Sequence, residues 1–222
     1  MGLYFNEPEQ PAQACVIWLH GLGADAQNMM GVVDALPTER PIRHVFVDAP
    51  VRPVTLNNNM PMRAWYNIVG MKLTDREDRD GILQSEKMIQ DVIASQLADG
   101  FTSKQIHLAG FSQGGAMALF IGLRSSVPLG GIIALSAYLP LVAECVNAGV
   151  DTTPIWMAMG EHDPVVLPSW TRQSFDWLIS QKFKHTSLKS YPMEHMICLE
   201  EIRDLSSWLS DQISLITCDG DI

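Results

Sequence analysis

The segment 110–114, Gly-Phe-Ser-Gln-Gly, constrains the fold of this 222-residue chain more than any other feature. An apolar run at 106–109 precedes it, and a helix-like run at 115–120 follows it. A sharp turn between a strand and a helix leaves no room for a Cβ atom on either side of the serine, and it strains the backbone of the serine itself. The spacing therefore predicts a strand–turn–helix unit in which the Ser112 hydroxyl stands exposed at the end of a sheet.

A Gly-x-Ser-x-Gly pattern in this setting is typical of the nucleophile elbow of serine hydrolases. A serine alone is a weak nucleophile, so the chain must supply a base and a group that orients it. In such folds the acid and then the histidine follow the serine, each after a later strand. His195 fits best, because it lies in a short loop between the predicted strand Thr186–Tyr191 and the final helix. His185 sits inside a strand-like stretch, and His162 is interpreted as a solvated loop residue.

The acid is expected directly after the preceding strand, which the apolar run Ile155–Met159 predicts. Asp163 follows this run and is itself followed by Pro164. Proline disfavours helical geometry at the residue before it, so Asp163 is held in a loop. Glu161 and Asp151 are weaker alternatives because neither has this proline after it.

Acyl transfer also needs two donors for the oxyanion of the transition state. One is expected to be the backbone N–H of Gln113, the residue after the nucleophile, and the second comes from a loop after an early strand. The apolar run 16–19 is such a strand, and His-Gly-Leu-Gly at 20–23 follows it. Two glycines let the amides turn inward, so the N–H of Leu22 is the predicted second donor. The ring of His20 is predicted to hold this loop in place.

Six strand-like runs alternate with helix-like segments, which predicts an α/β fold. The expected strands are Cys15–Leu19, Arg43–Val47, Ile106–Gly110, Gly131–Leu135, Ile155–Met159 and Thr186–Tyr191. Crossover helices imply a mostly parallel central sheet with helices on both faces. Apolar stripes predict core helices at 81–98 and 199–213. We expect one domain over 1–222 without a large cap domain, and a frayed tail at 216–222.

One long stretch, 49–80, is predicted to be irregular because it contains several prolines and three consecutive asparagines. Loops of this length in a compact domain are usually functional or disordered. It contains Met60, Met62, Trp65 and Tyr66, and methionine side chains adapt to varied apolar groups. We therefore predict an acyl-chain groove beside the nucleophile, with simple packing of the loop onto the sheet as the alternative.

The motifs together resemble the phospholipase/carboxylesterase family, which includes acyl-protein thioesterases and small bacterial carboxylesterases. Four segments carry the resemblance: 20–23, 110–115, 160–166 and His195 in its terminal loop. It runs from about residue 14 to residue 209, with the motifs in matching order. The segment 63–67 also resembles an Arg-x-Trp-aromatic-Asp segment of the family, but Asn67 stands where the family has aspartate.

The resemblance implies an α/β-hydrolase fold with Ser112 as nucleophile, His195 as base and Asp163 as orienting acid. It also implies main-chain oxyanion donors at Leu22 and Gln113. The expected reaction is two-step acyl transfer from a carboxylic ester or thioester with a short-to-medium acyl chain. Lysophospholipase and acyl-protein thioesterase activities are alternatives, so the substrate is a small ester, a lysophospholipid or an acylated protein. Analogy within the family allows a homodimer. A binding module with a dead site is the remote alternative, and it would normally lack one member of the triad.

Composition excludes several other classes of function. The net charge of −10 repels a phosphate backbone, so nucleic-acid binding is not expected. Residues 1–10 contain neither the basic region nor the apolar run of a signal peptide, and the four cysteines show no paired spacing. The longest apolar stretch, 127–143, is interrupted by glycine, serine and proline and is interpreted as a buried strand and turn. We expect a cytoplasmic protein without metal or cofactor, since no metal-ligand cluster or nucleotide loop is present in the sequence.

Overall fold

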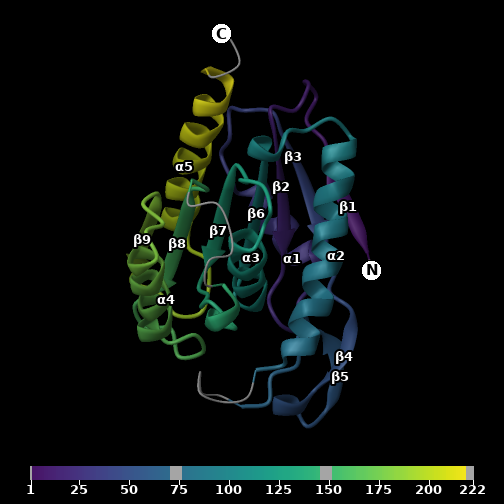
Figure 1. Ribbon diagram of the computed structural model, residues 1–222, viewed down its shortest axis with the longest axis vertical. Coiled ribbons are helices and arrows are strands. Elements are labelled where there is room, and N and C mark those ends of the chain that lie inside the picture. The colour runs from purple at the N-terminus through teal and green to yellow at the C-terminus, as the bar shows by residue number, and fades with distance from the viewer. Residues whose placement is uncertain (1, 71–76, 146–151, 219–222) are drawn as a thin grey trace.

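A seven-stranded sheet forms the centre of the computed structural model, which describes residues 2–70, 77–145 and 152–218 (Figure 1). The strand order is β1-β3-β2-β6-β7-β8-β9. β1 pairs with β3 in the antiparallel direction, and all other pairs are parallel. The bounds are β1 Leu3–Asn6, β2 Ala14–Leu19, β3 Ile42–Val47, β6 Ile106–Phe111, β7 Gly131–Leu135, β8 Ile155–Gly160 and β9 Thr186–Tyr191. The prediction of a mostly parallel α/β-hydrolase sheet is therefore confirmed.

Five helices cover the two faces of this sheet. They are α1 Ala26–Asp34, α2 Arg79–Ala98, α3 Gln113–Leu123, α4 Pro168–Ser180 and α5 Leu199–Cys218, with short 3₁₀ turns η1 Thr55–Asn57, η2 Ser103–Gln105 and η3 Val142–Glu144. The predicted core helices correspond to α2 and α5. Because α5 continues to Cys218, it includes the beginning of the stretch expected to fray, and residues 219–222 lie outside the described chain.

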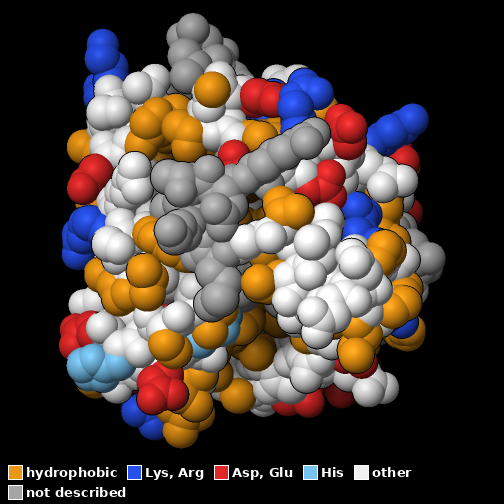
Figure 2. Space-filling model, turned by 90° about the horizontal axis from the view of Figure 1, so that it is seen from below, with side chains coloured by type: hydrophobic (Ala, Val, Ile, Leu, Met, Phe, Trp, Pro, Cys, Tyr) orange, Lys and Arg blue, Asp and Glu red, His pale blue; other side chains and the backbone are white. Residues whose placement is uncertain are grey.

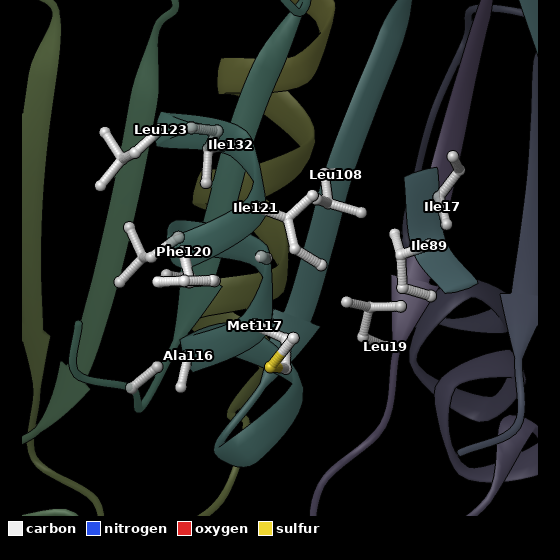
Figure 3. Packing of buried hydrophobic residues seen from close by; sticks show 14 of the residues in the cluster. Ile17, Leu19, Ile89, Leu108, Ala116, Met117, Phe120, Ile121, Leu123 and Ile132 are labelled. Carbon is white, nitrogen blue, oxygen red and sulfur yellow. The ribbon is translucent and has the colours of Figure 1, made fainter. Parts of the chain in front are cut away.

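Successive side chains of the strands pack alternately into two separate hydrophobic cores, one on each face of the sheet. Ile17 and Leu19 of β2 face the core that contains residues of α2, α3 and α4, whereas Val16 and Trp18 face the core beneath α1 and α5. This period of two is what a sheet covered on both faces requires. Figure 3 shows the first core, where Ile89 of α2 lies beside Ile17 and Leu19 of β2 and the side chains of α3 lie next to Leu108 and Ile132.

All eleven residues of α3 are buried. The helix begins at the end of β6, in the middle of the sheet, and packs closely against β6 and β7. A helix that is apolar all round belongs inside a protein, and this one supports the residue immediately before it. That residue is Ser112.

The prediction of an irregular stretch over 49–80 is wrong in part. Two strands lie within it, β4 (Val51–Val54) and β5 (Met60–Arg63). They form an antiparallel ribbon, and the 3₁₀ turn η1 connects them. Pro53 and Pro61 lie opposite each other in it. Proline cannot donate to a ladder and is confined to edge strands, which is why the sequence pattern concealed this ribbon. The stretch also contains residues 71–76, including Met71, which lie outside the described residues.

The carboxyl ends of the parallel strands lie at the lower end of the molecule in Figure 1, next to β4 and β5. The loops after β2, β6, β8 and β9 all leave the sheet at this edge, so the predicted site residues come together there. Within the described ranges, no helix has both the length and the apolar character needed to cross a membrane.

Candidate active site

Ser112 has a backbone conformation that side chains rarely adopt, with φ 55° and ψ −119°. Its N–H donates to the carbonyl of Leu135 at 2.8 Å, and its own carbonyl accepts from the N–H of Ala116 at 2.9 Å. These two bonds fix the turn between β6 and α3. Serine at the start of a helix usually caps the backbone, yet the Ser112 side chain makes no capping bond. The twisted backbone thus leaves the hydroxyl free to bond elsewhere.

Two glycines make this turn possible. A Cβ atom at Gly110 would overlap the backbone of Gly114, and a Cβ at Gly114 would overlap the carbonyl group of Leu19 on β2. The obstacle is backbone in both cases, so no rotation of a side chain relieves it. Residues 110 and 114 therefore need glycine for close approach, as the sequence pattern predicts.

We expect Gly114→Ala to lower the free energy of unfolding by about 3 kcal/mol or more, because α3 must move away from β2 to make room. Gly31→Ala is the matched control: this glycine lies inside α1 and an added Cβ would meet nothing within 4 Å. Alanine there should raise stability by about 1 kcal/mol, since it is the better helix former. Chemical denaturation measures both. Equal small effects at the two positions would contradict the steric argument.

Ser112, His195 and Asp163 lie in one chain of hydrogen bonds. The Ser112 Oγ is 2.9 Å from Nε2 of His195, and Nδ1 of the same ring is 2.7 Å from Oδ2 of Asp163. The Asp163 residue is 3% exposed. A carboxylate oxygen only accepts, so the proton of the neutral imidazole lies on Nδ1 and Nε2 is left to accept from the serine hydroxyl. This arrangement prepares a serine for deprotonation.

The second oxygen of Asp163 is held by the backbone. Oδ1 accepts from the N–H groups of Val165 at 2.8 Å and Val166 at 2.9 Å. Pro164, between Asp163 and Val165, has no N–H to offer, so the backbone donors come from the two residues after it. The aspartate is therefore locked with Oδ2 pointing at the histidine.

Two backbone bonds hold the loop of Asp163 against the loop of His195. The N–H of Glu161 donates to the carbonyl of Tyr191 at 2.8 Å, and the N–H of His162 donates to the carbonyl of Met193 at 3.1 Å. The His162 side chain itself is exposed, as the sequence interpretation expected. Because the two loops are fixed to each other, the distance between acid and base does not depend on the side chains alone.

His20 holds the loop after β2 in place. Its Nε2 accepts from the N–H of Ala49 at 3.0 Å, so the proton lies on Nδ1, which is 2.7 Å from the carbonyl of Gly21. Burial lowers the pKa of this imidazole and keeps it neutral. The indole Nε1 of Trp65 donates to the His20 carbonyl at 2.8 Å. Leu22 therefore belongs to a loop that is fixed on both sides.

The Gln113 side chain connects the nucleophile to the segment after β5. Its Oε1 accepts from the N–H of Trp65 and its Nε2 donates to the carbonyl of Tyr66, both at 2.8 Å. The N–H of Gly23 donates at 2.8 Å to the carbonyl of Arg63, the last residue of β5, so the chain just before this segment binds the loop that contains Leu22. The two predicted oxyanion donors are thus braced by one piece of chain.

An ion pair that sequence reasoning missed supports these loops. Arg63 lies 3.0 Å from the carboxylate of Asp48, and it also donates to the carbonyl of Ala49 at 3.2 Å. The other Asp48 oxygen accepts from the N–H of Ala26 at 2.9 Å. Asp48 is 2% exposed and directly follows β3. Its position after a predicted strand is the only signal in the sequence that could have identified it.

Asn67 closes the ribbon loop. Its Oδ1 accepts from the N–H of Thr55 and its Nδ2 donates to the Thr55 hydroxyl, both at 2.8 Å. An aspartate has no side-chain N–H and could not make the second bond in this form. The backbone N–H of Asn67 donates to Asp78 at 2.8 Å. Asparagine here has a structural task that explains its presence.

A cavity of about 340 Å³ opens beside the serine. Its wall is formed by Gly21, Leu22, Ala24, Leu56, Tyr66, Ile68, Gly70, Phe111, Ser112, Gln113, Tyr138, Val165, Val166, Trp170 and His195. Figure 2 shows this end of the molecule, where hydrophobic side chains surround a hollow with a histidine at its edge. The wall includes both predicted oxyanion donors, two members of the predicted triad, and otherwise mainly apolar side chains.

Of the four residues predicted to form an acyl groove, the cavity wall contains Tyr66 but not Met60, Met62 or Trp65. Met60 is 62% exposed at the start of β5, and the Met62 sulfur accepts from the amide of Asn57 at 3.2 Å. The indole of Trp65 is buried beneath the loop after β2. Met60 and Met62 belong to the ribbon of β4 and β5 and Trp65 follows it, an arrangement that the irregular stretch expected over 49–80 does not include.

Comparison with known proteins places the chain in a family. Residues 3–213 match the family model described as phospholipase/carboxylesterase. The chain is 36% identical to acyl-protein thioesterase 1 of Mycosarcoma maydis over 220 residues, which cover 90% of this chain and 91% of the relative. It is also 36% identical to acyl-protein thioesterase 1 of Neurospora crassa, covering 90% of this chain and 87% of that one.

The fold agrees with this assignment. The crystal structure of acyl-protein thioesterase 2 from Zea mays superposes with a TM-score of 0.86 at 24% identity, covering 96% of this chain and 99% of that one. The family model and the relatives confirm the resemblance found in the sequence motifs, and the solved structure shows the same fold. The chain therefore belongs to the phospholipase/carboxylesterase family and is a hydrolase.

Proposed function

We propose that this hydrolase cleaves esters or thioesters of short-to-medium acyl chains through Ser112, His195 and Asp163. The observation that carries the proposal is the hydrogen-bonded series from Ser112 Oγ through both ring nitrogens of His195 to the buried Asp163. This geometry allows Nε2 of His195 to accept the Ser112 proton while Nδ1 donates to Asp163. The names of the relatives support the ester or thioester as the bond that is broken.

In the first step the Ser112 oxygen attacks the substrate carbonyl carbon while its proton moves to Nε2 of His195. The ring becomes positively charged, and the Asp163 carboxylate stabilises it. The carbonyl oxygen takes the negative charge. The N–H groups of Leu22 and Gln113 receive this oxyanion, at the positively polarised start of α3.

Collapse of this intermediate breaks the bond to the alcohol or thiol. His195 gives its Nε2 proton to the departing oxygen or sulfur, and the acyl group remains on Ser112 as an ester. A water molecule then gives its proton to the same nitrogen as its oxygen attacks the acyl carbon. The Ser112 oxygen takes the proton back when the carboxylic acid leaves, so the enzyme returns to its starting state.

The cavity supports an acyl chain of limited length. Its volume of about 340 Å³ lies at the small end of the range for ligand pockets, and its wall is mostly apolar. The cavity concerns the acyl chain and not the alcohol or thiol part of the substrate. A small ester, a lysophospholipid and an S-acylated protein are therefore separate candidates. Among them we favour the S-acylated protein, because the relatives at 36% identity are acyl-protein thioesterases.

A panel of substrates tests the proposal. Purified protein is assayed with p-nitrophenyl esters of increasing chain length, with lysophosphatidylcholine and with a peptide carrying a thioester-linked octanoyl group. We expect hydrolysis of the shorter esters and of the thioester. Activity on lysophosphatidylcholine alone would favour the lysophospholipase alternative, and no hydrolysis of any member would contradict the proposal. Light scattering of the same sample tests the homodimer that the family resemblance suggests.

A further inference from the structure

Tyr66 and Tyr138, two residues of the mainly apolar cavity wall, meet through their hydroxyls. The Oη atoms of Tyr66 and Tyr138 are 3.2 Å apart, and both residues line the cavity beside Ser112. They come from distant parts of the chain: Tyr66 follows β5 and Tyr138 follows β7. The Tyr66 carbonyl is held by Gln113, and the Tyr138 ring packs edge-on against Trp170 at 6.1 Å between centroids. The Tyr66 backbone and the Tyr138 ring are thus each held by a neighbour, and their hydroxyls bond to each other.

The two hydroxyls of Tyr66 and Tyr138 carry one proton more than the hydrogen bond between them uses. Two hydroxyls carry two protons, and a single proton makes the bond between them. Among the described residues, the only hydrogen bond that either hydroxyl makes is the one to the other. Burial raises the pKa of both phenols, so neither loses its proton at neutral pH. One O–H donor is therefore left without an acceptor among the residues that the structure describes.

An unsatisfied donor in an apolar cavity costs free energy, and a ligand atom that accepts the proton removes that cost. A saturated acyl chain has no such atom beyond its carbonyl, which is taken by the oxyanion donors. A keto, ether or hydroxyl oxygen further along the ligand would supply the missing acceptor. The surrounding side chains of Ile68, Val166 and Trp170 would still pack against the carbon atoms on either side.

The acyl part is the part of the ligand that meets the tyrosines. His195 must reach both the serine oxygen and the leaving atom, so the leaving group departs on the imidazole side. The backbone carbonyl of Tyr66 accepts instead from the side chain of Gln113, whose N–H is a proposed oxyanion donor. The acyl chain extends into the cavity away from the imidazole, toward the wall that Tyr66 and Tyr138 form.

We propose that the Tyr66–Tyr138 pair is a polar subsite that selects acyl groups carrying an oxygen acceptor along the chain. This inference rests on the proposed function, because it concerns the acyl group that Ser112 accepts. The contrasting interpretation is that the pair only ties the segment after β5 to the segment after β7. In that case the pair would affect stability but would not distinguish one acyl group from another.

Matched esters separate these two interpretations. The p-nitrophenyl esters of 4-oxopentanoate, 5-oxohexanoate and 6-oxoheptanoate are each compared with the saturated ester of the same chain length, and rates without enzyme are subtracted. We expect kcat/KM to favour the oxo ester by about threefold to tenfold at one position of the ketone, which is the effect of one neutral hydrogen bond. Esters with the ketone in the alcohol part should show no such preference.

Tyr66→Phe, Tyr138→Phe and the double variant test the assignment to these hydroxyls. The double variant should lose the preference for the oxo ester, and the single variant that keeps it identifies the hydroxyl that does not face the chain. Tyr191→Phe is the matched control, because it removes a buried phenol that bonds to Asp204 at 2.7 Å outside the cavity. Its ratio of oxo to saturated ester should equal that of the wild type. If the double variant does not fold, at least one single variant must lower the ratio.

Three results would overturn the inference: no preference at any ketone position, a preference for the ketone in the alcohol part, or an unchanged ratio in a folded double variant. Each of these results can be observed only if the enzyme hydrolyses the saturated esters, that is, if the proposed function holds. Failure of the proposed function looks different, because no ester is hydrolysed and a fluorophosphonate does not react with Ser112 in the wild type.

Discussion

Ser112→Ala is expected to lower kcat by about a millionfold, because the variant has no oxygen to form the acyl-enzyme. The remaining residues of the site stay in place: His195 keeps its bond to Asp163, and the turn keeps its backbone bonds to Leu135 and Ala116. Alanine is also the smaller side chain, so the loss arises from chemistry and not from unfolding. Any residual rate reflects the oxyanion donors and binding alone.

A fluorophosphonate probe measures the same event without a chosen substrate. The serine oxygen displaces fluoride from phosphorus, and the stable adduct adds the mass of the probe to the peptide that contains Ser112. Wild-type protein should be labelled and Ser112→Ala should not. Ser126→Ala is a suitable control, since Ser126 is exposed in the turn between α3 and β7. Labelling that persists in Ser112→Ala would mean that another residue is the nucleophile.

Much of this site was predictable because its geometry leaves few residue types open. The turn at Ser112 requires glycine at 110 and 114 for steric reasons, so the pattern is visible in sequence. Asp163 and His195 each follow a strand, and parallel strands deliver their loops to one edge of the sheet. The apolar runs mark these strands in the sequence, so they also show after which strand the acid and the base each lie. These are local rules, and the structure brings the three side chains together accordingly.

Other features depend on contacts that no local rule encodes. The ribbon of β4 and β5 pairs Pro53 with Pro61, although proline disfavours a strand ladder. Met60 and Met62 lie in this ribbon, and the wall of the cavity does not include them. The short strand β1 was missed because four residues offer too little periodicity. Tyr138 belongs to no motif, and its meeting with Tyr66 depends on the packing of two distant segments. Residue propensities and motif spacing predict single helices, strands and turns. Contacts between distant segments depend on how the whole chain packs.

Asp163→Asn is expected to lower kcat/KM by about four orders of magnitude, because it places the proton of the His195 ring on the wrong nitrogen. In the native site Oδ1 accepts from the N–H groups of Val165 and Val166. An asparagine must keep its oxygen at that position, since its NH₂ group cannot accept. The NH₂ group then faces Nδ1 of the histidine and forces that nitrogen to act as an acceptor.

The imidazole proton consequently moves to Nε2, which points at the Ser112 oxygen 2.9 Å away. A protonated Nε2 cannot accept the serine proton, so the base is disabled although its position hardly changes. Glu161→Gln is the matched control: it alters a neighbouring carboxylate that accepts from Ser190 at 3.1 Å, and it should retain wild-type kcat/KM. A loss of less than tenfold in Asp163→Asn, or a comparable loss in both variants, would show that the orienting acid is misassigned. Because the two backbone donors to Oδ1 dictate the direction of the amide, asparagine should be at least as damaging as alanine at this position.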